Sequence, residues 1–329
     1  MLTAIAAKMT NKMILNRIQP VIDPRLRPNQ NGFRPGRSTT AQILALRRLI
    51  EGVKANKLKA IIVFVDFRKA FDSIHRGKMM RILKAYGVPE ALVNVISQLY
   101  ENTQAKDITP DGDTDLFNIL AGVLQGDTLA PYLFAIVLDY VMRQAINGRE
   151  SELGFELVSR RGRRQPPIYV TDLDFADDIA LLCEEIEQAQ KLLNSVEAEA
   201  AKVGLHVNAK KTEAMPYNHT TPLNIKTRSG NIIKEVDNFK YLGAWSQSSE
   251  KDFHVRKALA WSACHDLRKI WTSNISNKMK VNLFCATVEY VLTYGSDTWT
   301  LSKSLEKQLD GCYTRMLRMA LNIKGKIRN

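Results

Sequence analysis

The chain has 329 residues, of which 45% are hydrophobic, enough to bury one large core or two modest ones. Lys and Arg number 47 against 34 Asp and Glu, and the net charge of +13 favours a polyanionic partner, nucleic acid ahead of an anionic membrane surface. No stretch approaches the roughly 20 apolar residues of a membrane span, and the start lacks the apolar core and cleavage site of a signal peptide. The four cysteines form no C-x-x-C pair, which predicts an intracellular protein without a zinc site.

The N-terminal region predicts two helices separated by an irregular segment. Residues 1–20 alternate apolar and basic positions as an amphipathic helix does, and this helix is expected to end at its first proline. Residues 23–40 are rich in Pro, Gly, Arg and Asn, which is typical of a loop. Ser38 or Thr39 can cap the next helix, which is expected over about 41–54.

A buried strand is predicted at residues 61–65, which are β-branched or aromatic without a polar interruption. Asp66 directly follows this run. Open α/β sheets tend to place ligand-binding groups at the carboxyl ends of their strands. Asp66 is therefore a candidate ligand-binding acid.

The next part of the chain is mainly helical by its periodicity. We expect helices over 76–86, 89–101 and 130–146, a polar loop over 106–115, a short strand at 116–120 and a basic loop at 160–164. The segment 122–131 contains two glycines and a proline, which indicates a turn that opens the long apolar helix.

Two adjacent acids, Asp177 and Asp178, lie between apolar runs, as in a tight hairpin with buried strands and an acidic tip. Adjacent carboxylates repel each other and lose solvation on burial, which indicates a bound cation, although Asp-Asp is also common in polar turns. If the hairpin lies beside the strand at 61–65, three carboxylates converge, and oxygen ligands select magnesium or manganese. Two such ions roughly 3.5–4 Å apart clamp the oxygens of an in-line phosphoryl displacement. The pattern predicts phosphoryl transfer, and spacing alone leaves its kind open.

The remainder of the chain changes from strand-like to helical. A helix is expected at 184–203, strand-like segments from 205 to 243, and helices at roughly 253–271, 277–293 and 302–321. This change predicts a domain boundary near 240–250.

Six segments occur in an order that is specific as a set, although each is weak alone. They are Gln30–Thr39, Val65–Asp72, Gly122–Pro131, Phe175–Asp178, Gly204–Thr212 and Phe239–Gly243. In this order they resemble the fingers motif and motifs A to E of the reverse transcriptase of non-LTR, LINE-type retrotransposons, and the similarity covers nearly the whole chain. Phe175 stands where the family more often has Tyr.

The resemblance implies an α+β right-hand polymerase. Fingers would occupy residues 1–58, a palm 59–240 with a fingers insertion at about 76–120, and a helical thumb 241–329. The implied reaction is RNA-directed DNA synthesis, in which the primer 3′-hydroxyl attacks the α-phosphate of a dNTP with the help of two Mg²⁺ ions, or Mn²⁺. The implied partners are an RNA template, a DNA primer or RNA–DNA duplex, and dNTPs, in the nucleus or a cytoplasmic ribonucleoprotein. The oligomeric state stays open.

The resemblance also implies site residues. The metal ligands would be Asp66, Asp177, Asp178 and the backbone carbonyl of Phe67. Lys211, or the adjacent Lys210 in another register, would donate a proton to the pyrophosphate leaving group, although an exposed Lys-Lys pair needs no such role.

Contacts with nucleotide and nucleic acid are implied as well. The dNTP would be bound by Arg34, Arg37, Lys69, Phe71, Gln125 and Gly126. Phe71 is a candidate steric gate against a ribose 2′-hydroxyl, or a core phenylalanine. The nucleic acid would be contacted by Arg161, Arg163, Arg164, Tyr241, Leu242 and Gly243, the first three of which could also be part of a disordered basic loop.

The sequence leaves more than one interpretation of the function open. The family's domain normally begins before the segment that resembles Ile5–Lys8, which predicts fingers that lack their start. The intact acids favour an active polymerase, whereas the shortened start favours a catalytically inactive RNA-binding remnant. Group II intron maturases and RNA-dependent RNA polymerases share the palm, but residues 294–299 and motifs A and B look more like the retrotransposon group.

Overall fold

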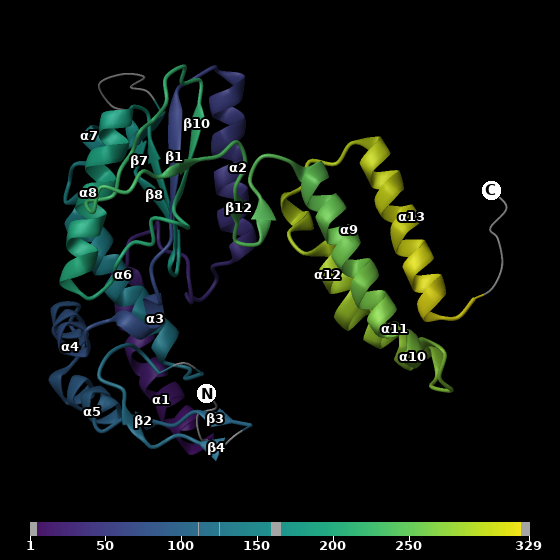
Figure 1. Ribbon diagram of the computed structural model, residues 1–329, viewed down its shortest axis with the longest axis horizontal. Coiled ribbons are helices and arrows are strands. Elements are labelled where there is room, and N and C mark those ends of the chain that lie inside the picture. The colour runs from purple at the N-terminus through teal and green to yellow at the C-terminus, as the bar shows by residue number, and fades with distance from the viewer. Residues whose placement is uncertain (1–4, 111, 125, 159–165, 324–329) are drawn as a thin grey trace. The chain divides into compact units, whose positions relative to one another are not determined.

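The structure is a computed structural model that describes residues 5–110, 112–124, 126–158 and 166–323. Contacts divide the chain into two compact units (Figure 1). Unit 1 comprises residues 1–42 and 48–237, and unit 2 comprises residues 43–47 and 238–329. Within the described ranges, no helix is both long and apolar enough to cross a membrane.

Unit 1 contains a five-stranded sheet with the strand order β11-β10-β1-β9-β8. The middle strand, β1 (Ala60–Val65), is buried along its whole length, which confirms the prediction of a central strand. It pairs in antiparallel fashion with β10 (Glu213–Tyr217) and with β9 (Asp178–Cys183). β8 (Asp172–Phe175) continues the sheet antiparallel to β9, and β11 (Lys234–Glu235) runs parallel to β10.

One face of the sheet packs against two helices of 17 residues each. Ile61 and Val63 of β1 belong to the core that includes α6 (Ala130–Ile146) and α8 (Ile186–Lys202). α6 is buried on nearly all sides, as expected for its continuous apolar sequence, and it coincides with the predicted range. The opposite face is buried too, since Ile62 has no exposed surface.

Unit 1 contains further helices besides α6 and α8. They are α1 (Ile5–Ile22), the 3₁₀ turn η1 (Asp23–Arg25), α2 (Thr39–Ala55) outside 43–47, α3 (Ala70–Ser73), α4 (Arg76–Ala85), α5 (Glu90–Tyr100) and α7 (Glu150–Leu153). The Ser38 side chain caps α2 by accepting a hydrogen bond from the Ala41 amide at 3.1 Å. Pro20 does not end α1, which continues to Ile22 because a proline in the last turn removes few helical hydrogen bonds.

Three small hairpins complete unit 1. They are β2 (Gln104–Ala105) with β5 (Phe117–Asn118), β3 (Ile108–Thr109) with β4 (Gly112–Asp113), and β6 (Phe155–Val158) with β7 (Ile168–Val170). The predicted polar loop at 106–115 thus contains a short hairpin, and the predicted strand at 116–120 is reduced to two residues.

Unit 2 is helical apart from the hairpin of β12 (Lys240–Tyr241) and β13 (Ala244–Trp245). Its helices are α9 (Ser249–Asp266), α10 (Arg268–Trp271), α11 (Asn277–Phe284), the π-helix η2 (Cys285–Glu289), α12 (Tyr290–Thr293), the 3₁₀ turn η3 (Ser296–Thr298) and α13 (Lys303–Ala320). Trp271, Phe284 and Met316 are fully or almost fully buried in its core.

A short part of α2 belongs to unit 2 because Arg47 is bound there. The Arg47 guanidinium donates hydrogen bonds to the Thr298 carbonyl at 2.8 Å and the Trp245 carbonyl at 2.9 Å. It also lies 3.3 Å from the buried Asp252 carboxylate. These contacts neutralise a buried charge and satisfy backbone carbonyls of β13 and η3.

Candidate active site

The register of β1 and β9 brings two of the predicted acids to the same end of this strand pair. Val65, the last residue of β1, is paired with Ile179. Because the strands are antiparallel, the residue after Val65 lies beside the residue before Ile179. Asp66 and Asp178 are therefore neighbours, with Asp177 next to them in the turn between β8 and β9.

The backbone of Asp66 is held from the β10 side. The Asn208 amide donates to the Asp66 carbonyl at 2.7 Å, and the Asp66 amide donates to Thr212 Oγ1 at 3.2 Å. Phe67 is buried and forms an isolated antiparallel bridge with Val207. Lys211 is exposed on the same 208–212 turn, as is Lys210.

The carboxylates influence one another electrostatically. Burial, followed by the charges of Asp177 and Asp66, raises the pKa of Asp178 to about 6. Burial also raises the pKa of Asp177, with a further contribution from Asp66, although a hydrogen bond from its own backbone amide acts in the opposite direction. Repulsion of this kind is what a bound cation would remove.

The three acids offer oxygen ligands of the kind that a hard metal ion prefers. Within the described ranges, no three His, Cys, Asp or Glu side chains are gathered closely enough to hold an ion, so the acids do not form a preassembled coordination group. However, Asp66 Oδ2 is buried and has no hydrogen-bond partner among the described residues. A buried carboxylate oxygen without a donor is costly, and a divalent cation would satisfy it. The residues fit a hard cation in their chemistry.

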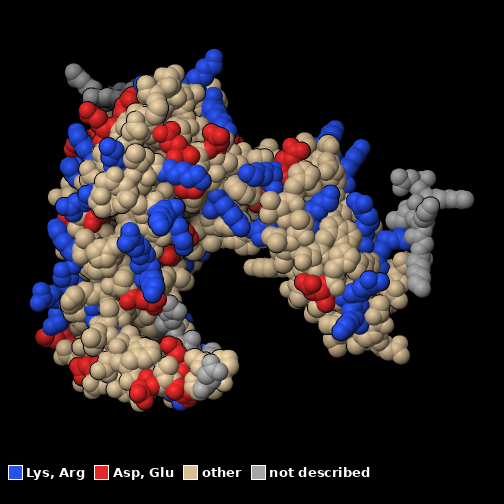
Figure 2. Space-filling view, viewed as in Figure 1, with Lys and Arg blue, Asp and Glu red and all other residues tan. Residues whose placement is uncertain are grey.

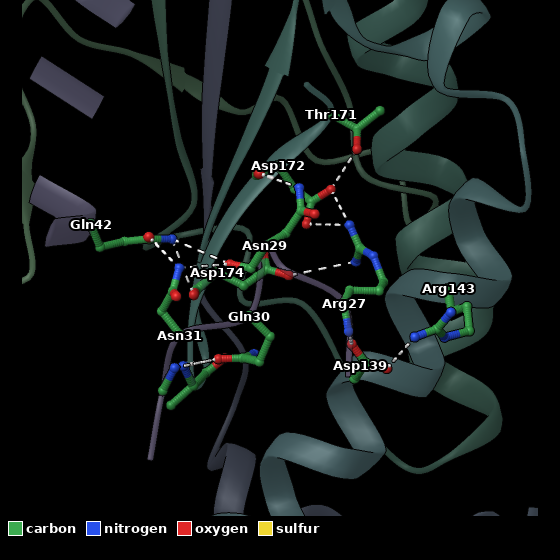
Figure 3. Close-up of polar contacts among 12 residues, drawn as sticks. Arg27, Asn29, Gln30, Asn31, Gln42, Asp139, Arg143, Thr171, Asp172 and Asp174 are labelled. Carbon is green, nitrogen blue, oxygen red and sulfur yellow. Dashed lines mark hydrogen bonds and ion pairs between the residues drawn. The ribbon is translucent and has the colours of Figure 1, made fainter. Parts of the chain in front are cut away.

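A buried polar cluster surrounds Asp172 and Asp174 of β8, the strand that precedes the turn with Asp177 (Figure 3). Arg27 binds the Asp172 carboxylate with both oxygens within 2.6 Å of Nη2 and lies 3.7 Å from Asp174. Burial and the neighbouring Asp172 raise the pKa of Asp174 well above its usual range, against the opposing effect of Arg27. None of these residues was among the predicted site residues, although Asp172 and Asp174 alternate along a strand and so share one face.

The predicted nucleotide-binding residues differ in their surroundings. Arg34 is buried, and its guanidinium donates to the Asp23 carboxylate at 2.8 Å and to the Gln30 carbonyl at 2.8 Å. These partners favour a structural role for Arg34. Arg37 and Lys69 are exposed, and Lys69 begins α3 with a left-handed φ of 45°.

Phe71 lies between two other aromatic rings. It stacks on Phe134 of α6 with centroids 4.3 Å apart and meets Phe33 edge-on at 6.3 Å. Its half-buried ring is compatible both with a gate and with a core residue. The Val123 amide donates to the Phe71 carbonyl at 2.8 Å, which attaches the predicted motif B turn to α3.

Of the predicted motif B pair, Gln125 and Gly126, the structure describes only Gly126. Gly126 is exposed and has a φ of 84°, a conformation that glycine adopts without a steric penalty. Gln125 lies outside the described residues, as do Arg161, Arg163 and Arg164 of the basic loop.

Tyr241, Leu242 and Gly243 belong to unit 2, at the turn between β12 and β13. Leu242 and Gly243 both have positive φ, as a two-residue hairpin turn requires. The Leu242 carbonyl accepts a hydrogen bond from Tyr294 Oη at 2.9 Å, and Tyr241 is buried. Figure 2 shows Lys and Arg side chains spread over the visible surface rather than gathered in one patch.

Comparison with protein families gives one match over most of the chain. The model of the family described as reverse transcriptase (RNA-dependent DNA polymerase) matches residues 1–245. This range contains Asp66, Asp177 and Asp178.

Several curated proteins are similar in sequence. A putative uncharacterized transposon-derived protein of Caenorhabditis elegans is 29% identical over 160 residues, covering 47% of this chain and 57% of that protein. The Pol polyprotein of the type-2 retrotransposable element R2DM of Drosophila melanogaster is 29% identical over 255 residues, 73% of this chain and 22% of the polyprotein. The probable RNA-directed DNA polymerase from transposon BS of the same fly is 25% identical over 252 residues, with 72% and 26% covered. The chain thus spans between 22% and 57% of these relatives.

Solved structures show the fold. Telomerase from Candida albicans, in complex with a fragment of telomeric RNA, gives a TM-score of 0.50 at 12% identity over 97% of this chain and 55% of that chain. Apo telomerase from Candida tropicalis gives 0.50 at 13% identity with the same coverage. The mixed α+β fold is therefore similar to that of telomerase reverse transcriptase.

Proposed function

Because the chain belongs to the reverse transcriptase family and is related to the Pol proteins of non-LTR retrotransposons, we propose that it is an RNA-directed DNA polymerase. It would extend a DNA primer on an RNA template with dNTPs. The observation that carries the proposal is the register of β1 and β9, which makes Asp66 and Asp178 neighbours at the end of a buried strand pair.

The carboxylates of Asp66, Asp177 and Asp178, with the Phe67 carbonyl, would hold two Mg²⁺ or Mn²⁺ ions. Such ions supply Lewis-acid activation of the primer hydroxyl and neutralise charge that develops on the phosphate. Asp66 is suited to this role because its Oδ2 is buried without a donor among the described residues. The hydrogen bonds from Asn208 and to Thr212 keep its backbone in place.

Other residues would bind the nucleotide and donate a proton to its leaving group. The Lys211 ammonium would give a proton to the pyrophosphate oxygen as the bond to the α-phosphate breaks. Arg37 and Lys69, both exposed, would bind triphosphate oxygens. The Phe71 ring, held against Phe134, would exclude a ribose 2′-hydroxyl.

We assign the regions by the same premise. Residues 1–58 would be fingers, 59–240 the palm and 241–329 the thumb, which is supported by the boundary between Asp237 and Asn238. The partners would be an RNA template, a DNA primer or RNA–DNA duplex, and dNTPs, and the net charge of +13 supports a polyanionic partner.

Primer extension tests this proposal. The purified chain, a DNA primer annealed to an RNA template, dNTPs and Mg²⁺ should yield extended primer, and Asp177→Asn should lower the rate by about 100-fold or more. Asp115→Asn is the matched control, because Asp115 is an exposed acid between β4 and β5 and should leave the rate unchanged.

The inactive alternative has its own outcome. If the wild-type chain binds the primer–template, as measured by fluorescence anisotropy, but extends it no faster than Asp177→Asn, the polymerase proposal is wrong. The chain would then be an RNA-binding remnant that has kept the fold and the charge.

A further inference from the structure

We propose that Gln30 is a positioning residue whose buried side-chain amide holds the turn at Ala176 and thereby fixes the direction of Asp177 and Asp178. The consequence for metal binding rests on the proposed polymerase function. The hydrogen bonds between the Gln30 side chain and Ala176, here called the clamp, are a property of the fold and can be measured without catalysis.

The contacts between Gln30 and the turn use both atoms of the carboxamide. Gln30 has no exposed surface. Its Oε1 accepts a hydrogen bond from the Ala176 amide at 2.8 Å, and its Nε2 donates to the Ala176 carbonyl at 3.3 Å. The side chain thus binds Ala176 as a neighbouring backbone strand would.

Ala176 needs such support because of its conformation. Phe175 is paired with Asp178, so Ala176 and Asp177 form a two-residue turn between β8 and β9. Ala176 has a φ of 53°, which is the left-handed region that alanine adopts at a cost. A conformation of this kind persists only where its surroundings determine it, and Asp177 directly follows it.

Gln30 is itself held in place by the edge of the sheet (Figure 3). It forms a parallel bridge with Asp174, in which the Asn31 amide donates to the Asp174 carbonyl at 2.9 Å and the Asp174 amide donates to the Asn29 carbonyl at 3.1 Å. The Arg34 guanidinium donates to the Gln30 carbonyl at 2.8 Å. The segment 29–31 therefore acts as a short edge strand that carries Gln30 to the turn.

Position 32 must be glycine for the backbone to lie this close to Ala176. The Gly32 amide donates to Gln30 Oε1 at 2.8 Å, so one oxygen binds two backbone amides. A Cβ atom at position 32 would lie 2.2 Å from the Ala176 nitrogen, which no real contact allows. Only glycine permits the backbone to pass this close to the turn.

The matched control is Gln42, a second buried amide in the same network. Its Nε2 donates to the Asp174 carbonyl at 3.1 Å, and its Oε1 accepts from Asn31 Nδ2 at 2.6 Å. Loss of the Gln42 amide weakens the same edge without removing a bond to Ala176. Gln30→Met and Gln42→Met each replace an amide by an apolar side chain of similar length.

Hydrogen exchange of the Ala176 amide in the metal-free chain tests the clamp. We expect Gln30→Met to accelerate this exchange by about tenfold or more relative to wild type, because the acceptor of that amide is removed, and Gln42→Met to change it much less. If Gln30→Met does not fold, Gln30→Asn, which is shorter by one methylene and cannot reach both groups, takes its place. Unchanged protection of Ala176 in a folded Gln30 variant overturns the proposal.

Mn²⁺ binding, followed by electron paramagnetic resonance, tests the consequence. The dissociation constant should rise about tenfold in Gln30→Met and remain near wild type in Gln42→Met, and in primer extension kcat should fall with little change in the KM for dNTP. Equal Mn²⁺ binding in both variants and wild type contradicts the positioning role. If wild type neither binds Mn²⁺ nor extends a primer, the proposed function fails, whereas the exchange at Ala176 still decides the clamp.

Discussion

Asp178 shows at the scale of one residue how the fold changes the chemistry of a side chain. Its usual pKa of 3.8 is raised to about 6 by burial and by two neighbouring acids. Between these values the folded chain holds a proton that the unfolded chain has lost, so the free energy of unfolding falls as the pH rises through this window. The acid therefore destabilises the metal-free protein at neutral pH.

Asp178→Asn should remove this penalty. In the presence of a chelator and at about pH 8, we expect its free energy of unfolding to exceed that of wild type by about 1 kcal/mol. The value is modest because the carboxylate is only partly desolvated: the residue keeps exposed surface, and water screens its charge. The difference should shrink toward about pH 4, where the wild-type acid is protonated in the folded chain and only partly ionised in the unfolded chain. Urea unfolding at both pH values measures it, and a variant less stable than wild type at the higher pH would contradict the expected repulsion.

Phe71 is a second residue whose role a substitution can separate. We expect Phe71→Ala to raise incorporation of ribonucleotides relative to deoxynucleotides by about tenfold or more, because the ring that would meet a 2′-hydroxyl is gone. Phe33→Ala is the matched control, since Phe33 contacts the same ring edge-on. Competition between rNTP and dNTP in primer extension measures the ratio. An equal change in both variants would mean that Phe71 is a packing residue.

At the scale of elements, the edge strand β8 is the best example of a part that depends on a distant segment. Arg27 and Asp172 are 145 positions apart, yet they form a bidentate ion pair that is almost fully buried. The Arg27 amide also donates to Asp139 of α6 at 2.7 Å. Arg27 thus ties the loop after α1 to both a strand and a helix that carry the site.

Arg27→Met should destabilise unit 1 by about 3–5 kcal/mol, because it leaves the Asp172 carboxylate buried without its cation. Arg37→Met is the control at an exposed arginine and should stay within about 0.5 kcal/mol of wild type. Chemical denaturation followed by circular dichroism measures both. A loss below about 1 kcal/mol for Arg27→Met would show that the two acids are neutral in the fold.

At the scale of the whole molecule, the two units have separate cores, and their unfolding can be followed by different spectroscopic signals. All four tryptophans, at positions 245, 261, 271 and 299, belong to unit 2. Tryptophan fluorescence therefore follows unit 2, whereas circular dichroism follows the helices and strands of both units.

Leu138→Ala in α6 should unfold unit 1 selectively. Leu138 is fully buried, and its truncation should cost about 2–5 kcal/mol. We expect the dichroism transition in urea to begin at lower denaturant while the tryptophan transition stays in place, because multidomain chains need not unfold in one step. Gln144→Ala, at an exposed position of the same helix, should move neither. A joint shift of both transitions in Leu138→Ala would show one cooperative unit.

The sequence by itself determined the elements whose residues are close in the chain. The apolar run at 61–65 predicted the central strand, and the long apolar helix was found at Ala130–Ile146 as expected. Of the two predicted helix caps, Ser38 and Thr39, the structure has Ser38 in that position. These features follow from periodicity and from local hydrogen bonding, which a sequence carries directly. The expectation of a bound cation at the adjacent acids also came from local sequence, and it stays a prediction.

Only the tertiary structure decided which distant side chains meet. Gln30 and Ala176 are 146 positions apart, and nothing in either local sequence specifies their hydrogen bonds. Arg34 resembled a phosphate-binding residue, but its partners Asp23 and the Gln30 carbonyl become known only when the loop is folded. The register of β1 against β9 likewise depends on the burial of both faces, which a whole sheet and its helices must provide. The sequence thus named the acids, and the folded sheet decided which of them are neighbours and what holds their turn.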